Sequence, residues 1–345
     1  MEWKLFERVC NTPGVSGYED EAQEVVSEVL GTCCDKVRRD RMGNVIGLKK
    51  ATRGVRKGRR PRRVAVAAHV DEIGMMVKHI DDNGYIGFHP LGGLFTQVLA
   101  SQRVVIHGQK LVRGVIVPRM KDMRDKVATL AELRIDTGMS REALEKRIEV
   151  GDIITLDTPV ARLNGKVYVG RNFDDRAGVY CMLEAMRRVG PLAVDAYAVG
   201  TVQEEVGVRG MRPAAYAIEP DIALAVDGSL CHGAYGDEKD QICALGEGAG
   251  IYLVDNLTIG PRHLVRFLFD LCKKDQIPCQ KNIGGGTDAS VLQRSRCGAL
   301  ATTVGAPVRY MHSTVQVCHD DDMEATIRLL ATFLEHAHEL PLEAR

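Results

Sequence analysis

The sequence lacks the features that mark membrane, secreted and nucleic-acid-binding proteins. It has no run of about 18 or more apolar residues, so it offers no transmembrane helix. Its 46 Lys and Arg are balanced by 46 Asp and Glu, and this formal neutrality argues against capture by nucleic acid or an anionic membrane. The opening MEWKLFERVC is too charged for the apolar stretch of a secretory signal. We therefore expect a cytoplasmic globular protein.

Cysteines are present, but not in the spacing that a zinc ribbon or a thioredoxin-type redox site needs. Ten cysteines are scattered along the chain, and no two of them form a C-x-x-C pair. We expect reduced thiols, several of them acting as small buried apolar residues.

Charge of one sign is concentrated in a single segment, residues 52–63. It carries seven Arg or Lys in twelve residues, together with Gly and Pro. No aromatic residue interleaves to stack on bases, so we interpret the segment as a solvated hairpin tip and not as a nucleic-acid patch.

Short apolar runs that alternate with helical patterns indicate an α/β domain. Such runs occur at residues 64–68, 194–202, 222–226 and 299–304. Residues 177–189 and 323–334 have apolar side chains at helical spacing. This alternation predicts a mostly parallel sheet, in which ligands bind beyond the carboxyl ends of the strands.

Residues 74–163 have a different texture. They contain short, glycine-rich strands at 85–89, 103–107, 113–117 and 152–156, and one helical piece at 140–149. Period-2 strands with frequent turns predict a small β-barrel-like domain. We expect it to be inserted into the α/β domain, which would then comprise residues 1–73 and 164–345.

Polar residues follow the predicted strands of the α/β domain. The carboxylates among them would meet at one sheet edge: Asp71, Asp174, Glu204, Glu205 and Asp227. Partly buried anions cost several kcal/mol each unless they are paired, so a positive partner should lie among them. His69 and His312 follow strands of the same set, and divalent metal is the simplest candidate.

The charge of this set favours two metal ions. If the ligands are His69, Asp174, Glu205, Asp227 and His312, their formal charge is −3, which two divalent ions and one bridging hydroxide bring to zero. Histidine and carboxylate without cysteine suit Zn²⁺, Co²⁺ or Mn²⁺ in an open catalytic site. Such a pair of ions is typical of metal-assisted hydrolysis.

Spacing limits the roles of the neighbouring residues. Asp71 lies two residues beyond His69, so it can orient that ring from the same face of a strand. Glu204 and Glu205 are adjacent, so one can bind metal while the other takes a proton from the attacking water. The spacing leaves open which glutamate does which.

Seven motifs in order make the sequence resemble a family of dinuclear metallo-aminopeptidases. These motifs are PGVSGYE (13–19), AHVDEIG (68–74), NFDDRAG (172–178), QEEVGVRG (203–210), AVDGS (225–229), GGGTDAS (284–290) and RYMHS (309–313). The family includes the tetrahedral (TET), glutamyl and deblocking aminopeptidases, and some members carry an endoglucanase label.

The resemblance implies specific roles. His69, Asp174 and Asp227 would bind one ion, and Asp174 would bridge to a second held by Glu205 and His312. Glu204 would be the general base and Asp71 the partner of His69. It also implies a phosphorylase/hydrolase-like catalytic domain and a PDZ-like dimerisation insert. Members form dimers and often dodecamers, and they remove N-terminal residues from peptides with a free α-amine.

The glycine-rich GGGTDAS segment is not a phosphate-binding loop, because it lacks the Gly-Lys-Ser/Thr ending. Its glycines suit close approach of the backbone to a substrate, so we expect Gly285, Thr287 and Asp288 to line the pocket. Cys231 and His232 are interpreted as pocket wall and not as further ligands.

Two other functions remain open on the residues alone. Another metal-dependent amidase, such as a deacylase, would accept a blocked α-amine, whereas an aminopeptidase would not. A non-catalytic scaffold would bind less than one ion per chain after metal loading. A glycosidase is disfavoured, since it needs two metal-free carboxylates beside the bond.

Overall fold

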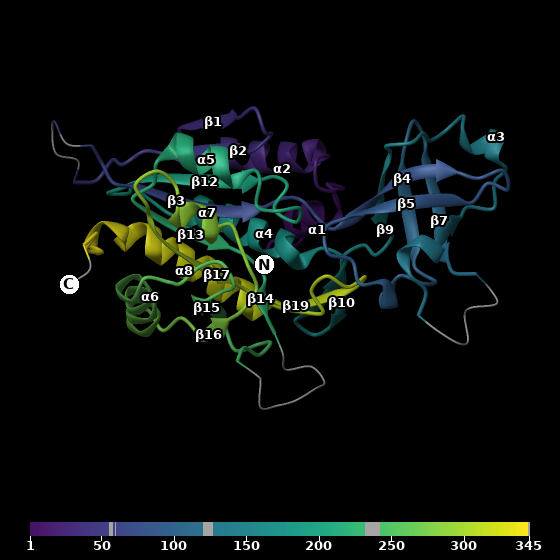
Figure 1. Cartoon of the computed structure of the whole chain (residues 1–345). Helices are drawn as coiled ribbons and strands as arrows, with labels where there is room; N and C mark the ends of the chain where they lie inside the picture. The colour runs from purple at the N-terminus through teal and green to yellow at the C-terminus, as the bar shows by residue number, and fades with distance from the viewer. Residues whose placement is uncertain (55–57, 59, 120–126, 232–241, 344–345) are drawn as a thin grey trace.

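The computed structural model describes residues 1–54, 58, 60–119, 127–231 and 242–343. The chain forms a mixed α/β unit with a closed six-stranded barrel beside it (Figure 1). None of the helices in the described ranges is long and apolar enough to cross a membrane.

An eight-stranded sheet is the centre of the larger unit. Its order is β1 (Lys36–Arg39), β2 (Val45–Lys49), β12 (Asp195–Thr201), β3 (Arg63–His69), β13 (Ile222–Val226), β17 (Leu300–Gly305), β15 (Ala249–Val254) and β16 (Cys279–Ile283). The central strands β12, β3, β13 and β17 run parallel. On either side of them, β2 pairs antiparallel with β12, and β15 pairs antiparallel with β17. Consequently, the carboxyl ends of the central strands meet at one edge.

Alternate side chains of β3 explain why both faces of this sheet are covered. Val64, Val66 and Ala68 join one apolar core, and Ala65 and Ala67 join another. The first core also takes in α1 (Trp3–Asn11), α2 (Asp20–Gly31), α4 (Phe173–Arg188), α6 (Arg262–Lys274) and α8 (Asp320–His336), and the second takes in α5 (Met211–Ile218) and α7 (Ala289–Gln293).

A second, smaller sheet was not expected from the sequence. Its order is β10 (Ala161–Asn164), β11 (Val167–Gly170), β19 (Gln316–His319), β18 (Pro307–Arg309) and β14 (Ser229–Leu230). Strand β11 pairs with β10 and β19 in this sheet and does not join the main one. It nevertheless feeds α4, whose first residues reach the edge of the main sheet.

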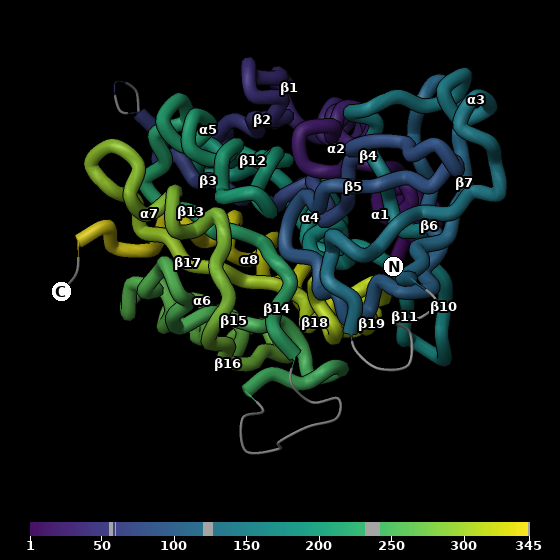
Figure 2. Tube along the Cα trace, turned by 45° about the vertical axis from the view of Figure 1, so that its right-hand side comes forward, coloured from purple at the N-terminus to yellow at the C-terminus, as the bar shows by residue number. Residues whose placement is uncertain are grey.

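The closed barrel confirms the prediction of a small β-barrel-like structure among residues 74–163, and it follows β3 in the chain. Its strands are β4 (Gly74–Ile80), β5 (Ile86–Leu91), β8 (Arg134–Asp136), β7 (Leu111–Val117), β6 (Arg103–His107) and β9 (Ile153–Leu156), with the short helix α3 (Arg141–Leu144). Its interior is a separate apolar core, built from residues such as Met75, Ile106 and Ile154. Figure 2 shows it packed beside the larger unit.

The prediction of a hairpin at residues 52–63 is wrong. β2 and β3, which flank the segment, do not pair with each other, because β12 lies between them. Arg62 donates to the main-chain carbonyls of Ala337, His338 and Leu340, so this basic residue docks the end of the chain. Residues 55–57 and 59 of the segment lie outside the described residues.

Candidate active site

Five side chains from separate segments meet at the carboxyl edge of the main sheet. His69 is the last residue of β3, and Asp227 directly follows β13. Glu205 lies in the loop after β12, Asp174 in the first turn of α4, and His312 in the loop between β18 and β19. The parallel strands of the main sheet bring His69, Glu205 and Asp227 together. Asp174 and His312 follow strands of the smaller sheet.

These side chains form two clusters that share Asp174. The ligand atoms of His69, Asp174 and Asp227 all lie within 4.8 Å of one another, as do those of Asp174, Glu205 and His312. Nε2 of His69 is 3.1 Å from Oδ1 of Asp174, and Nε2 of His312 is 3.4 Å from Oδ2 of the same carboxylate. One carboxylate therefore faces both histidines, one with each oxygen.

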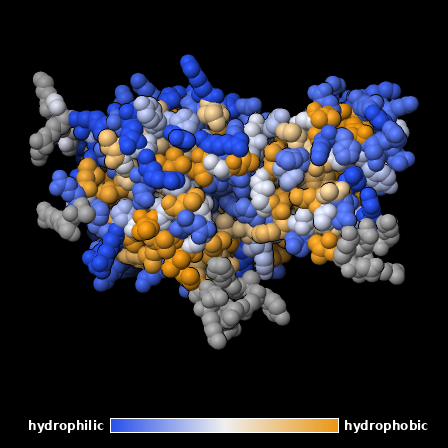
Figure 3. All heavy atoms as spheres, viewed as in Figure 1, coloured by the Kyte–Doolittle hydropathy of each residue, from blue (hydrophilic) through white to orange (hydrophobic). Residues whose placement is uncertain are grey.

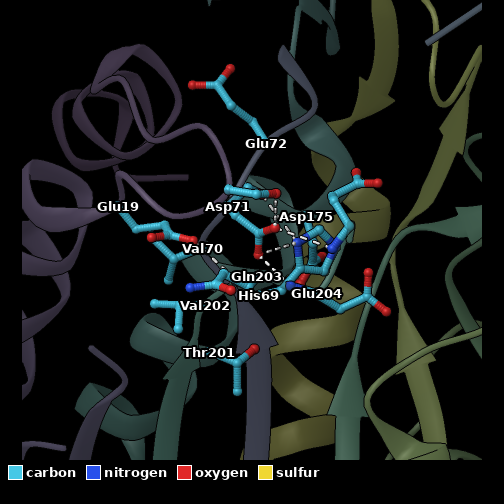
Figure 4. A network of polar contacts seen from close by, with 12 residues as sticks. Glu19, His69, Val70, Asp71, Glu72, Asp175, Thr201, Val202, Gln203 and Glu204 are labelled. Carbon is cyan, nitrogen blue, oxygen red and sulfur yellow. Dashed lines mark hydrogen bonds and ion pairs between the residues drawn. The ribbon is translucent and has the colours of Figure 1, made fainter. Parts of the chain in front are cut away.

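Asp71 holds the neighbouring loop as well as facing His69. Nδ1 of His69 donates to the main-chain carbonyl of Asp71 at 3.1 Å and lies 3.6 Å from its carboxylate. The carboxylate accepts the backbone N–H groups of Glu204 and Glu205 at 2.9 and 3.1 Å. Figure 4 shows Asp71 and His69 facing each other with Glu204 beside them, while Glu72 points away. Asp71 thus ties the strand that bears His69 to the loop that bears both glutamates.

Two residues in the loops that carry the site have a left-handed backbone conformation. Gln203, just before the two glutamates, and His312 have φ angles of 57° and 60°. For residues with a Cβ this left-handed region is costly, so the surrounding contacts must enforce it.

The electrostatics of the clusters are those of a crowded anionic site. Burial raises the pKa of Asp227 and of Glu204 well above the usual range, and it raises that of Glu205 to about 8. Burial also acts on Asp174, but hydrogen bonds from His312 and His69 outweigh it and hold that pKa below its ordinary value. Without added positive charge, these carboxyls cannot all ionise near neutral pH.

The donor set fits divalent metal. Three buried carboxylates and two histidines, with Nδ1 of each histidine bonded to a main-chain carbonyl, leave Nε2 and the carboxylate oxygens facing one another. This pattern is typical of zinc-type sites, in which the second ring nitrogen is fixed by a neighbour. Two cations would also relieve the repulsion among the carboxylates.

A cavity of about 480 Å³ opens onto both clusters. His69, Asp174, Glu205, Asp227 and His312 lie in its wall together with Glu204. The lining also includes large apolar or aromatic side chains: Phe95, Leu230, Tyr252 and Met311. The cavity therefore combines charged and apolar side chains, as substrate pockets usually do.

The glycine-rich segment lies partly where the sequence placed it. Gly285 and Thr287 line the cavity. Asp288 is buried, and its Oδ2 accepts a hydrogen bond from Thr201 at 2.6 Å, which directs it towards β12. Leu230 is part of the wall, whereas His232, which we expected there with Cys231, lies outside the described residues.

Several supporting residues could not be assigned from the sequence. Ser16 donates to Asp71 at 2.6 Å, Glu19 accepts the N–H of Gln203 at 3.0 Å, and Gln316 accepts the N–H of Asp174 at 2.8 Å. Ser16 and Glu19 belong to the PGVSGYE motif, to which the sequence alone assigns no role. Gln316 carries no motif, and only its place in β19 brings it to Asp174.

A buried ion pair also supports the carboxyl edge of the main sheet, close to the end of β3. Arg171 contacts Glu72 at 2.7 Å, and both side chains are buried. Arg176, also buried, donates through Nε to the carbonyl of Val70, between His69 and Asp71. These contacts join the start of α4 to the end of β3.

Comparison with known proteins identifies the family. The sequence profile of M42 glutamyl aminopeptidases matches residues 43–329. The chain belongs to this family. It is accordingly a hydrolase of the aminopeptidase class, as the resemblance of the motifs predicted.

Individual relatives of this M42 chain agree over nearly its whole length. It is 34% identical to a lysyl aminopeptidase of Pyrococcus furiosus, over 97% of each chain. Its structure is similar to that of an aminopeptidase from Desulfurococcus kamchatkensis, with a TM-score of 0.92, 36% identity and coverage of 96% and 94% of the two chains. It is also similar to the TET1 peptidase of Pyrococcus horikoshii, described as assembling into a tetrahedron or a large octahedral shell, with a TM-score of 0.84, 30% identity and coverage of 96% and 98%.

Proposed function

We propose that this chain is a dinuclear metal-dependent aminopeptidase that removes residues from peptides with a free N-terminus. The observation that carries the proposal is the pair of three-residue clusters that share Asp174 and open onto one cavity. One ion would be held by His69, Asp174 and Asp227, and the other by Asp174, Glu205 and His312. When bound, such ions polarise a scissile carbonyl and lower the pKa of water.

Glu204 is the proposed general base. It lines the cavity but belongs to neither cluster, and Asp71 fixes its backbone. Its carboxylate takes the proton of the attacking water and passes it to the leaving amine. Asp71 contacts both the ring of His69 and the backbone N–H of Glu204, so it fixes their relative positions.

Glu204→Gln tests this assignment. The variant should bind metal as the parent does while kcat falls by about 100-fold or more, because the amide cannot accept the proton. Glu7→Gln, at an exposed position of α1, is the matched control and should be fully active. A Glu204→Gln enzyme with near-parental kcat would remove Glu204 from this role.

The apolar residues in the cavity lining favour an apolar N-terminal side chain. They include Leu230, Tyr252 and Met311, and no Lys or Arg appears among the described residues that line the cavity. A panel of chromogenic aminoacyl substrates, assayed with Zn²⁺, Co²⁺ and Mn²⁺ added separately to stripped enzyme, should favour leucyl and methionyl over glutamyl and lysyl substrates. Hydrolysis of acetylated peptides at equal rates would instead favour the deacylase alternative.

We also propose how the chain is organised and where it acts. Residues 1–73 and 164–345 would form the phosphorylase/hydrolase-like catalytic domain, and residues 74–163 a PDZ-like insert for self-association into dimers and dodecamers. Exposed Leu111 and Val115 of the barrel support this, and Figure 3 shows apolar side chains gathered on the barrel and on the larger unit. Light scattering of the purified chain measures the assembly. All ten cysteines are free, which supports a cytoplasmic location.

A further inference from the structure

The barrel reaches the proposed active site through one short segment. After β5, residues Gly92–Phe95 leave the barrel and run along the metal-binding loops before the 3₁₀ turn at Thr96–Val98. The segment makes two contacts with the cluster formed by Asp174, Glu205 and His312, and it adds one residue to the lining of the cavity.

The first contact is a hydrogen bond to His312. Its Nδ1 donates to the carbonyl of Gly93 at 3.0 Å, while Nε2 faces Asp174 and Glu205 at 3.4 and 3.7 Å. A proton held on Nδ1 leaves the lone pair on Nε2, which is the form of histidine that binds metal. The carbonyl thus sets both the tautomer and the direction of the ring.

The second contact is the close packing of Gly92 and Gly93 against neighbouring side chains, which the lack of a Cβ at both positions allows. A Cβ on Gly93 would lie 2.6 Å from Nδ1 of His312. A Cβ on Gly92 would lie 2.7 Å from Ile73 and 3.4 Å from the Cβ of Glu205, and Gly92 has a φ of 83°. Only glycine at position 93 allows the segment to approach His312 this closely, and the φ of Gly92 and its closeness to Ile73 also require glycine.

Phe95 adds the cavity wall. Its ring centroid is 6.4 Å from that of His312, and it lines the same cavity as Leu230 and Met311. More than half of the Phe95 side chain is exposed, at 54%, although it is a large apolar group. An apolar ring exposed at the mouth of a pocket is suited to contact a bound side chain.

We propose that segment Gly92–Phe95 is the barrel's contribution to the active site: Gly93 positions His312 for the second metal ion, and Phe95 contacts the substrate. The proposal rests on the dinuclear site proposed above. It makes Gly93 a positioning residue and Phe95 a specificity-determining one.

Calorimetric titration of Zn²⁺ into the stripped full-length chain tests the role of Gly93. In Gly93→Ala, the affinity for one of the two ions should fall by about 10-fold or more, while the other ion binds as in the parent. Gly190→Ala is the matched control, since a Cβ there meets nothing within 4 Å. Equal affinities in Gly93→Ala and parent would overturn the positioning role while leaving the dinuclear proposal intact. Failure of the parent to bind two ions would instead overturn the dinuclear site itself.

Phe95→Ala keeps the proposal testable if Gly93→Ala does not fold. For leucyl peptides its KM should rise by about 10-fold with kcat and both metal affinities unchanged, and Phe95→Leu should restore part of the loss. Tyr85→Ala, another exposed aromatic residue of the barrel, should leave KM unchanged. An unchanged KM in Phe95→Ala would show that the ring does not contact the substrate.

Discussion

The two clusters proposed to bind metal share one aspartate but are built differently. His69 is 2% exposed and ends a strand of the main sheet, whereas His312 is 35% exposed and lies in a loop. The first cluster thus rests on the rigid carboxyl edge of β3 and β13. The second depends on loops and on a segment of the barrel, so we expect its ion to be held less tightly and to respond to changes outside the catalytic unit.

Replacement of Asp174, which both clusters share, should disrupt both clusters at once and has the largest expected effect. Asp174→Asn should lose at least about 1,000-fold in kcat, because groups that act as a unit fail together when one is removed. Metal analysis after dialysis should find both ions lost. Asp82→Asn, whose side chain is 94% exposed on the barrel, serves as control. Retention of two ions by Asp174→Asn would contradict the bridging role.

Replacement of each histidine in turn should sharpen the comparison. His312→Ala should weaken one ion by more than about 100-fold, beyond the usual cost of losing a supporting contact, and leave the tighter ion in place. His69→Ala should lose the tighter ion and keep the weaker one. Titration calorimetry of both variants against the parent measures this, and identical losses in the two variants would show that the clusters do not act as separate sites.

The pH dependence of the metal-free chain is the smallest expected effect. Burial raises the pKa of Glu205 to about 8, and a hydrogen bond to Asp174 raises that of His312 to about 9. Both groups hold protons more tightly in the folded than in the unfolded chain, so stability should fall as pH rises from about 5 to 9. The Tm of the stripped chain should therefore drop by a few degrees over this range, and bound Zn²⁺ should remove most of the drop. A stripped chain that becomes more stable with rising pH would contradict this account of the second cluster.

The sequence was most informative where a candidate ligand lies directly at the end of a predicted strand. His69 and Asp227 stand at the ends of apolar runs, so the parallel topology alone predicted that they would meet. The barrel was predictable for a similar reason, because its short strands alternate with glycine-rich turns.

The remaining features depend on contacts between distant segments. The smaller sheet was missed because its strands are short and come from three separate regions, and β14 and β18 contain only two and three residues. The main-chain carbonyl of Gly93 accepts from His312, and the side-chain amide oxygen of Gln316 accepts from the N–H of Asp174. Both contacts join segments that are distant in sequence, so no local residue pattern reveals them. The hairpin predicted at 52–63 failed because β12, which is distant in sequence, lies between its two strands.

Anomalous diffraction at the zinc edge from crystals of the metal-loaded chain tests the central claim most directly. We expect two peaks, one among His69, Asp174 and Asp227 and one among Asp174, Glu205 and His312, with the second weaker after brief treatment with a chelator. A single peak, or none between these side chains, would contradict the dinuclear site.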